Sequence, residues 1–382
     1  MSSILLKQDF GFSSNMFTAF AFCAGLLILA TLLPLSRNSK WWIRGLDFPR
    51  LQLAIGSGFL VTLELSLLEL TQPASWWLII PTILCFAYQA WWILPYTKLV
   101  APEVEPAEDE LLEDKTSTCI SIITANVLMT NRNARKLLEL VRQYQPDILV
   151  TLESNDWWQS HLDQLSGQYP HAVKCPLDNL YGMHLYSRRE LINTEIQYLV
   201  EKDVPSIHAC VKLAQQQIRL HCLHPAPPSP TENEVSSERD AELVMVAKNI
   251  EKTKDSSTPI IVTGDMNDVA WSRTTRLFRK ISGLLDPRIG RGMFNTFHAD
   301  YWFMRWPLDH LFHSEHFTLR TMQRLPGFGS DHFALYTELA LVPHKAETQS
   351  GIDKEAGDEE MAQEILQGQQ VSSDNVVNPT RS

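Results

Sequence analysis

The sequence lacks paired cysteines, and its central part lacks an excess of positive charge. Its six cysteines are scattered, with no CxxC pair and no zinc-ligand spacing, so a zinc ribbon or finger is excluded and the redox compartment stays open. Residues 116–345 contain 24 Lys and Arg and 25 Asp and Glu, so this part is nearly neutral, although the whole chain carries a formal net charge of -11. The composition therefore does not provide the basic surface that general nucleic-acid binders use.

Long apolar runs dominate the first hundred residues. Residues 16–35, 51–70 and 76–96 are each about twenty residues long, enough to cross a hydrocarbon core of about 30 Å. No basic segment precedes the first run and two more runs follow it, which disfavours a cleaved signal peptide. Tryptophan pairs lie near the ends of the runs, as is typical at membrane interfaces. The sequence predicts three transmembrane helices, and hence an integral protein of the bacterial inner membrane that contacts the lipid bilayer.

The cations of the first connecting loop bear on orientation. Arg37, Lys40, Arg44 and Arg50 favour a cytoplasmic loop by the positive-inside rule, and three spans then place the C-terminal domain in the cytoplasm too. The alternative is an interfacial segment at residues 41–48, whose cations contact lipid headgroups. The side that the C-terminal domain faces stays open between these two interpretations.

Three further segments follow the apolar region. Residues 101–115 are acidic and contain proline, which predicts a solvated linker. Residues 116–345 alternate strand-like runs with helical patterns, which predicts an α/β domain. Residues 346–382 show no apolar periodicity except in a short stretch at 359–366 that can form a helix, and we otherwise expect a disordered tail.

One stretch of the α/β domain combines a buried strand with polar residues. The apolar run at residues 260–262 leads into Gly264, and Asp265 and Asn267 follow two residues apart. In an extended segment these two side chains share a face and point at one ligand. The alternative is a strand that ends in an ordinary polar turn.

Other predicted strands also end in residues that can bind a metal ion or take part in catalysis. The runs at residues 120–127 and 148–152 deliver Asn126 and Glu153, and such an oxygen-rich site suits Mg²⁺. The run at 218–224 ends at His224 before a proline, with His221 as the second choice in that strand. His184 and His208 are expected to be core histidines. Later in the chain come Asp309 and then the pair Asp331 and His332, in which a carboxylate from another strand can orient the histidine.

In this order, these residues resemble the endonuclease/exonuclease/phosphatase superfamily, which contains pancreatic-type deoxyribonucleases, abasic-site endonucleases, sphingomyelinases and inositol-phosphate phosphatases. The resemblance spans residues 118–341 and rests on the ordered set rather than on any single motif. It implies a four-layered α/β sandwich, in which two β-sheets pack face to face between helices.

The resemblance also implies roles for individual residues. Asn126 and Glu153 match metal-holding positions, and Asp331 matches an acidic position near the metal or leaving group; the metal is Mg²⁺, with Mn²⁺ as the alternative. Five residues match the catalytic positions: Asp265 activates the attacking water, Asn267 orients water and phosphate, His224 contacts phosphate oxygens, and Asp309 orients His332.

Two features depart from the family pattern. The deoxyribonuclease subgroup has a further glutamate on the strand that matches residues 181–187, where this chain has Tyr181 and His184. Residues 286–306 match no family motif and are rich in arginine and aromatic residues. We expect either a packed surface loop or a substrate-recognition loop in which Arg288, Arg291 and Arg305 bind phosphate and the rings bind a base or acyl chain.

The leading interpretation is a membrane-anchored, metal-dependent hydrolase that cleaves a phosphodiester or phosphate ester with an activated water. A nuclease is the family default for its phosphate-containing substrate. One alternative is a phosphatase or pyrophosphatase that acts on a lipid-linked phosphate. The other is a non-catalytic membrane scaffold, which the complete set of site residues opposes.

Overall fold

The computed structural model describes residues 2–107, 118–213, 215–254, 257–343 and 348–380. The chain divides into two compact units, residues 1–95 and 96–382. The predicted domain of residues 116–345 lies inside the second unit.

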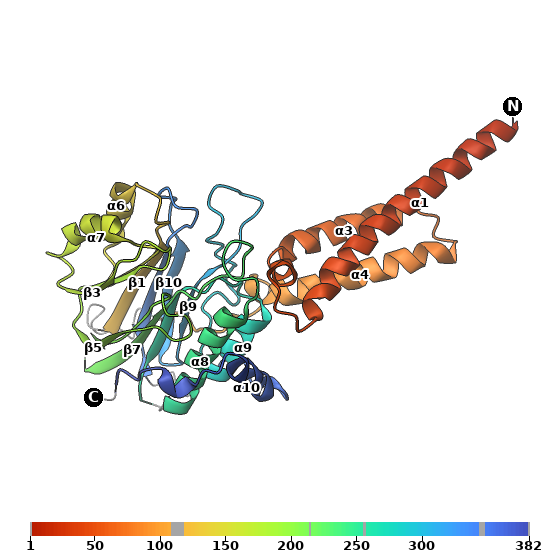
Figure 1. Cartoon of the computed structure of the whole chain (residues 1–382). Helices are drawn as coiled ribbons and strands as arrows, with labels where there is room; N and C mark the ends of the chain where they lie inside the picture. The colour runs from red at the N-terminus through yellow and green to blue at the C-terminus, as the bar shows by residue number, and fades with distance from the viewer. Residues whose placement is uncertain (1, 108–117, 214, 255–256, 344–347, 381–382) are drawn as a thin grey trace. The chain divides into compact units, whose positions relative to one another are not determined.

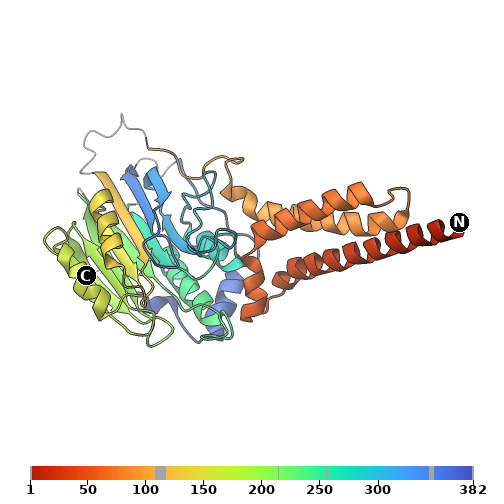
Figure 2. The ribbon, with the colours of Figure 1, turned by 90° about the horizontal axis from the view of Figure 1, so that it is seen from above.

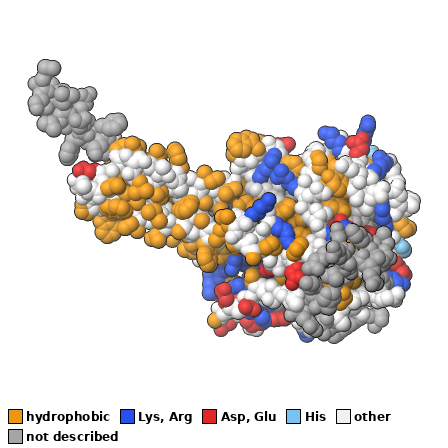
Figure 3. Space-filling model, turned by 180° about the vertical axis from the view of Figure 1, so that it is seen from behind, with side chains coloured by type: hydrophobic (Ala, Val, Ile, Leu, Met, Phe, Trp, Pro, Cys, Tyr) orange, Lys and Arg blue, Asp and Glu red, His pale blue; other side chains and the backbone are white. Residues whose placement is uncertain are grey.

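The first unit is helical. Its long helices are α1 (Ser2–Leu32), α3 (Arg50–Leu67) and α4 (Pro73–Ile93), which run side by side (Figures 1 and 2). The short helix α2 (Trp41–Arg44) lies between α1 and α3, flanked by the turns η1 (Leu33–Leu35) and η2 (Gly45–Asp47). Hydrophobic side chains cover the outside of these helices (Figure 3). Inside the bundle, Phe20 and Ala24 of α1 pack with Leu60 of α3.

Two helical segments of the described chain are long and apolar enough to cross a membrane, at Asn15–Leu35 and Pro73–Tyr96. The prediction of three such spans was wrong in its second member, residues 51–70. That run forms α3, which begins at Arg50, carries Glu64 and ends at Leu67. By length and composition the two remaining segments are weak evidence for a membrane protein, because core helices and signal sequences have the same properties.

The charged and polar residues of the first unit contact one another between its helices. Glu64 accepts a hydrogen bond from Thr82 at 3.2 Å, and Arg50 donates to Gln89 at 3.1 Å. Gln89 in turn donates to Thr31 of α1 at 3.0 Å. These bonds join α1, α3 and α4 through groups that are costly to leave unpaired away from water.

The second unit is built on two mixed β-sheets. The six-stranded sheet has the order β10-β11-β1-β2-β4-β3, and the five-stranded sheet has the order β5-β6-β7-β8-β9. In each sheet one neighbouring pair is parallel, β1 with β2 and β7 with β8, and the other pairs are antiparallel. The strands are β1 (Cys119–Asn126), β2 (Ile148–Leu152), β3 (His171–Cys175), β4 (Met183–Ser187), β5 (Leu191–Gln197), β6 (Ser206–Leu213), β7 (Gln216–Leu223), β8 (Ile260–Asp265), β9 (Asp309–His313), β10 (Phe317–Arg324) and β11 (Leu335–Leu341).

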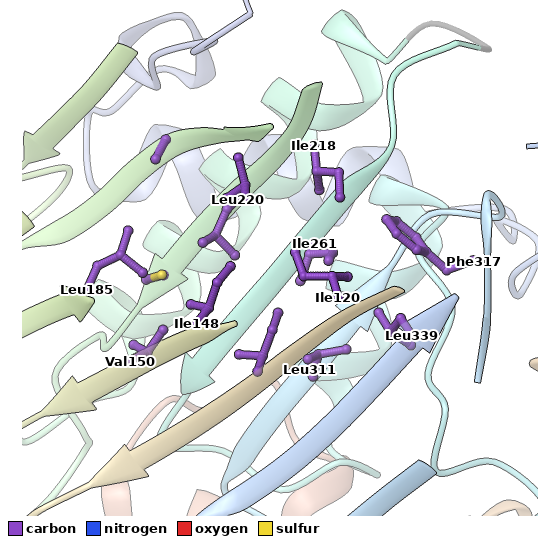
Figure 4. Close-up of a cluster of buried hydrophobic side chains, with 14 of the residues drawn as sticks. Ile120, Ile148, Val150, Leu185, Ile218, Leu220, Ile261, Leu311, Phe317 and Leu339 are labelled. Atoms are coloured by element: carbon purple, nitrogen blue, oxygen red, sulfur yellow. The ribbon is translucent and has the colours of Figure 1, made fainter. Parts of the chain in front are cut away.

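Alternation along the strands divides the core into three layers. Ile120 and Ile122 of β1 face the other sheet and pack with Leu220 and Ile261, so apolar side chains fill the space between the sheets (Figure 4). Ile123, one residue along, faces outward instead and packs under helices α6 (Ala134–Tyr144) and α7 (Asp156–Leu162).

The opposite outer face follows the same rule. Ile260 and Val262 of β8 pack under α8 (Ser237–Thr253) and α9 (Arg273–Ser282). Figure 1 shows α6 and α7 on one side of the paired sheets and α8 and α9 on the other. The unit is therefore a four-layered α/β sandwich, as predicted.

Two segments outside the predicted domain pack onto this sandwich. Residues 101–107 of the predicted linker contribute Val104, which is fully buried, and Glu103, whose carboxylate lies 2.5 Å from Arg279. The remainder of the predicted linker, residues 108–115, lies outside the described residues.

The predicted disordered tail is the larger difference. It contains helix α10 (Asp358–Gly368) and the turn η7 (Ser373–Asn375), and Ala362 and Val376 are buried against the α8 and α9 layer. Helix α10 covers the stretch 359–366 whose helical potential the sequence indicated, and its packing on the α8 and α9 layer is a tertiary contact that the sequence pattern did not predict.

Candidate active site

The candidate site begins where the two sheets meet at the ends of β1 and β8. Thr124 and Thr263 share a hydrogen bond of 2.7 Å between the sheets, and both side chains are buried. Two residues further along each strand, on the same face, come Asn126 and Asp265. The amide Nδ2 of Asn126 donates to Oδ2 of Asp265 at 3.1 Å, so the two predicted residues are in direct contact.

Glu153 follows β2, the strand parallel to β1, and contacts the same asparagine. Asn126 Nδ2 donates to Glu153 Oε1 at 2.7 Å, while Asn126 Oδ1 accepts from the backbone N of Leu128 at 3.1 Å. The other carboxylate oxygen of Glu153, Oε2, is buried and makes no hydrogen bond with the described residues. Burial raises the pKa of Glu153 to about 7, with Asp331 and Asp265 adding to the increase. Glu153 therefore has an unused, buried oxygen directed away from solvent.

Asp309 and His332 form the other half of the cluster. Asp309 is paired with Asp265 in the β8–β9 register, and its Oδ2 lies 2.8 Å from Nδ1 of His332. Nε2 of His332 lies 3.5 Å from Oδ2 of Asp265. Although burial alone disfavours the cation, Asp309 and Asp265 raise the pKa of His332 to about 10. The imidazole is consequently a cation at neutral pH, held between two buried carboxylates.

Asp265 stays ionised in spite of its burial. Burial raises its pKa, but the positive charge of His332 and the influence of His224 outweigh this, and backbone N of Asn267 also donates to Oδ1 at 2.9 Å. The net effect is a pKa below the usual range of an aspartate. Asp265 is thus available as a base or as a negative ligand near neutral pH.

Asn267 lies beyond the end of β8, so the extended geometry that the sequence suggested does not reach it. Its backbone has a left-handed φ of 51°, and its side-chain Nδ2 donates to the carbonyl of Pro225 at 3.0 Å. Arg239 of α8, which is buried, donates to the Asn267 carbonyl at 2.8 Å. Backbone turn geometry therefore positions Asn267 beside Asp265.

His224 follows β7 and is buried, and its Nδ1 has no hydrogen-bond partner among the described residues. Its ring lies 5.4 Å from the ring of Tyr181, and burial lowers its pKa to about 4. His221, the second choice, instead lies within the sheet with Nδ1 2.6 Å from Nδ1 of His208. His224 is thus the histidine of this strand that belongs to the cluster.

The expected core histidines are in the core. His184 is fully buried on β4, with Nδ1 2.5 Å from Oγ of Ser154, and burial lowers its pKa to about 4. His208 is likewise buried and lies 2.9 Å from Oγ of Ser206.

Asp331 is half-buried at the edge of the cluster. Its Oδ1 accepts from Oγ of Ser330 at 3.3 Å, and its charge raises the pKa of both Glu153 and His332. Asp331 therefore contributes negative charge to the site, but no hydrogen bond joins it to Asn126 or Glu153 in the described structure.

Two of the three arginines expected to bind substrate have structural partners. Arg288 is fully buried and its guanidinium contacts Asp286 at 2.8 Å and Nδ1 of His310 at 2.7 Å. Arg291 donates to the carbonyls of Pro287 and Val104, the latter at 2.6 Å. Both guanidiniums therefore contact neighbouring groups of the fold, although Nη1 of Arg288 is buried without a hydrogen-bond partner among the described residues. Substrate binding by Arg288 and Arg291 stays a prediction.

Arg305 differs from these two. It is half-buried and donates to the Ala299 carbonyl at 2.9 Å, in a loop whose Ala299 N donates to the Asp331 carbonyl at 2.6 Å. Its guanidinium lies 5.0 Å from the ring of Phe333, the residue after His332. Arg305 is therefore close to the cluster in the fold.

The cluster has the donor atoms of a cation site. Asp265, Asp309 and His332 each offer one ligand atom, and these atoms lie within 4.8 Å of one another. Glu153 Oε2 and Asp309 Oδ1 are buried without a hydrogen-bond partner among the described residues. Carboxylate oxygens of this kind fit a hard divalent cation.

Sequence reasoning missed three residues that shape the site. Tyr181 lies against His224, Phe297 lies 4.9 Å from the ring of His332, and Arg239 contacts the Asn267 loop. Tyr181 is noted in the sequence only as a departure from the family pattern. Phe297 was expected only as one of the rings in residues 286–306, and no spacing signal marks Arg239, because it reaches the site through tertiary packing.

Comparison with solved structures finds proteins of similar fold. The structure is similar to D. rerio TDP2 complexed with a single strand DNA product, at 19% identity over 58% of this chain and 98% of that chain, with a TM-score of 0.50. It is also similar to the human Nocturnin catalytic domain, at 20% identity over 59% of this chain and 94% of that chain, with a TM-score of 0.49. At such low identity, these likenesses concern the fold alone. No curated protein matches the sequence closely enough to count as a relative.

The family model adds independent evidence from the sequence. The model of the Endonuclease/Exonuclease/phosphatase family matches residues 123–332, more than half of the chain. The match begins in β1 and ends at His332, so it includes both halves of the cluster. The chain therefore belongs to the endonuclease/exonuclease/phosphatase family.

Proposed function

We propose that the protein is a membrane-anchored, divalent-metal-dependent phosphoesterase. One observation carries the proposal: Asn126, Glu153, Asp265, Asp309 and His332 meet in one cluster at the junction of the two sheets, linked by hydrogen bonds and ion pairs. The cluster combines one imidazole with three carboxyl groups. Such an arrangement suits a reaction in which a phosphate brings further negative charge.

The residues fit a Mg²⁺ ion, with Mn²⁺ as a substitute. Glu153 is the proposed principal ligand, since its Oε2 is buried and unused, and Asn126 orients Glu153 and Asp265 toward each other. Asp309 and Asp265 raise the pKa of His332, so we assign this imidazole to the phosphate rather than to the metal, and Asp331 adds negative charge from the edge of the cluster. A bound divalent cation supplies positive charge that neutralises phosphate oxygens.

Asp265 and His332 have complementary proposed roles. Asp265 is ionised and buried, so it can accept a proton from the attacking water. Protonated His332 donates a hydrogen bond to a phosphate oxygen through Nε2, while Asp309 fixes its ring through Nδ1. Neutral His224 offers a further hydrogen bond through its free Nδ1, and Asn267 holds the Asp265 carboxylate through its backbone.

The two candidate membrane segments support anchoring of residues 1–100, with catalysis assigned to residues 116–345. Three spans would place the second unit in the cytoplasm, but with two spans a cytoplasmic loop after α1, which carries Arg37, Lys40 and Arg44, places the second unit on the opposite side of the membrane. A reporter fused after Lys345 tests this placement. Activity of the reporter only inside the cytoplasm would overturn it.

The deciding experiment for the function uses the purified full chain in detergent. Plasmid DNA, RNA, bis(p-nitrophenyl) phosphate and a polyprenyl pyrophosphate are each offered with Mg²⁺, with and without EDTA. We expect EDTA-sensitive hydrolysis of at least one substrate, which Asp265→Asn abolishes. A nuclease is the first expectation among these, in keeping with the family name and the DNA complex of D. rerio TDP2. A folded protein that hydrolyses none of them would instead support a non-catalytic scaffold.

A further inference from the structure

An exposed apolar tip lies in the loop that carries Arg305. Tyr301, Trp302, Phe303 and Met304 are 51%, 79%, 53% and 42% exposed. Among the described residues of the second unit, only Leu99 and Tyr198 are other large apolar side chains with comparable exposure. Four such residues in succession form a contiguous apolar surface, and surfaces of this kind mark sites of interaction.

The tip stands on a stem that is fastened to the candidate active site. Backbone N of Phe297 donates to the Trp306 carbonyl at 3.0 Å, and N of His298 donates to the Met304 carbonyl at 3.1 Å. Ala299 N donates to the carbonyl of Asp331, and the Phe297 ring contacts the His332 ring. The stem therefore holds the tip at a fixed place beside His332.

Two arginines flank this stem. Arg305 and Arg324 lie on the same ring, that of Phe333, at 5.0 and 4.4 Å from its centroid. Both donate only to backbone carbonyls, and neither has a carboxylate partner in the part of the chain that the structure describes. Two cations without counterions, next to an apolar tip, match an amphiphile that has an anionic head and an apolar tail.

We propose that the tip formed by residues 301–304 enters the interfacial layer of a membrane, where Arg305 and Arg324 bind the phosphate headgroup of a lipid. The lipid headgroup is then presented to Asp265 and His332 as the substrate. This inference rests on the proposed phosphoesterase function and narrows its substrate class to phosphate esters of membrane lipids, in place of the nucleic acid that the family suggests by default.

A lipid surface explains the tip better than an unpaired nucleobase does. A base stacks on the face of one ring, whereas here three aromatic side chains and a methionine are exposed together. Tryptophan and tyrosine prefer the headgroup zone of membranes, and candidate membrane segments in the same chain keep the second unit within reach of one.

The first test measures insertion directly, in the full chain reconstituted into vesicles of phosphatidylcholine and phosphatidylglycerol. Trp302→Cys in a Cys23→Ser background carries an environment-sensitive fluorophore, and Tyr198→Cys in the same background is the matched control. We expect spin-labelled lipid to quench the label at position 302 and not the label at position 198. Equal quenching at both positions, or none at position 302, overturns the inference whether or not the protein is an active enzyme.

The second test measures substrate class. The double variant Trp302→Ala/Phe303→Ala is compared with Tyr198→Ala on vesicle phosphatidylglycerol, a polyprenyl pyrophosphate in vesicles, bis(p-nitrophenyl) phosphate and a single-stranded oligonucleotide. We expect the ratio of lipid hydrolysis to soluble-ester hydrolysis to fall at least about tenfold in the double variant, which corresponds to about 1.4 kcal/mol, and to stay constant in the control.

The outcomes of the second test separate the two proposals. Hydrolysis of the soluble ester or oligonucleotide by the wild type, without any hydrolysis of lipid, rejects the lipid substrate and leaves the phosphoesterase intact. A loss confined to the oligonucleotide in the double variant also overturns the inference, in favour of base stacking. Inactivity of the wild type on all four substrates rejects the proposed function itself.

Discussion

Nδ1 of His332 lies 2.8 Å from Oδ2 of Asp309, and the two residues come from different sheets. Asp309 begins β9 of the five-stranded sheet, while His332 precedes β11 of the six-stranded sheet. The pair can form only when the sheets are packed face to face, as is also true of the contact between Asn126 and Asp265. The charge of the candidate site therefore depends on the same sheet packing that buries the core.

The first prediction concerns Asp265 and His332. Asp265→Asn and His332→Ala should each lower kcat by at least about 100-fold, because groups that act as a base or stabilise transition-state charge contribute roughly 10²–10⁴-fold. KM should change much less, since both roles develop in the transition state. Asp353→Asn, which changes an exposed carboxylate, is the matched control and should retain full activity.

The same pair should also be non-additive. Because Asp265 and His332 act on one reaction step, the double variant should be little slower than either single variant. Circular dichroism checks that each variant is folded. A folded Asp265→Asn protein with near wild-type, EDTA-sensitive turnover would remove this assignment.

The second prediction concerns the metal. Glu153→Gln removes the negative charge of the proposed ligand but keeps the side-chain shape, so the main defect should be weaker binding of Mg²⁺. Activity should fall at low Mg²⁺ and recover in part as the concentration is raised, whereas Asp265→Asn should not recover. The control is Glu139→Gln on α6, which is exposed. The measurement is turnover as a function of Mg²⁺ concentration for each variant. Identical curves for Glu153→Gln and wild type would contradict the proposal.

The sequence was sufficient to predict that Asn126 and two acidic residues of the site lie together. Asn126, Glu153 and Asp265 each lie at or just after the end of a short apolar strand, and strand ends that share an edge place their side chains close to one another. The four-layered fold also followed from the ordered motifs. At these positions, the pattern of apolar strands that end in polar residues and the family resemblance both predicted the same site.

Sequence reasoning fell short where tertiary partners decide the outcome. Arginine is a residue type that commonly binds phosphate. The contacts of Arg288 with Asp286 and His310, however, form only when the loop packs against β9. The run at residues 51–70 is apolar on average, yet the helix formed there starts at Arg50 and pairs Glu64 with Thr82 of the next helix. The hydropathy or composition of one segment does not reveal its contacts with other segments.

The third prediction concerns pH and Glu242 of α8, which lies outside the candidate site. Glu242 is 2% exposed and its Oε1 has no hydrogen-bond partner among the described residues. Burial, with a further effect of Glu201, raises its pKa from 4.5 to about 8. The folded state thus binds a proton that the unfolded state releases, so this group destabilises the fold progressively as the pH rises from about 4.5 to about 8.

Glu242→Gln should remove that dependence, since glutamine keeps the shape and has no proton to lose. We expect the variant to melt at a higher temperature than the wild type at pH 8 and at a similar temperature at pH 5. One unit of pKa shift corresponds to about 1.4 kcal/mol, so the gain at pH 8 should be readily measured. Near-UV circular dichroism of the full chain follows the melting. A constant difference between the two proteins at all pH values would contradict the assigned cause.

The last prediction tests whether α10 is part of the folded unit. Ala362 is fully buried against the α8 layer, and Lys248 of α8 lies 2.7 Å from Glu359 of α10. Ala362→Asp buries an unpaired carboxylate and should lower the free energy of unfolding by about 1–3 kcal/mol, in line with the cost of an unsatisfied buried polar group. The matched control is Gln363→Asp, one residue along the same helix, which is exposed and should change stability by less than about 0.5 kcal/mol. Alanine is the better helix former, so Ala362→Asp also loses more helix propensity than Gln363→Asp, by no more than about 0.7 kcal/mol, and a larger difference between the variants reports burial. Denaturant unfolding of the full chain measures the free energy of unfolding of each variant. Equal stabilities for the two variants would mean that residues 358–368 do not pack on α8, and the disordered tail expected from the sequence would be restored.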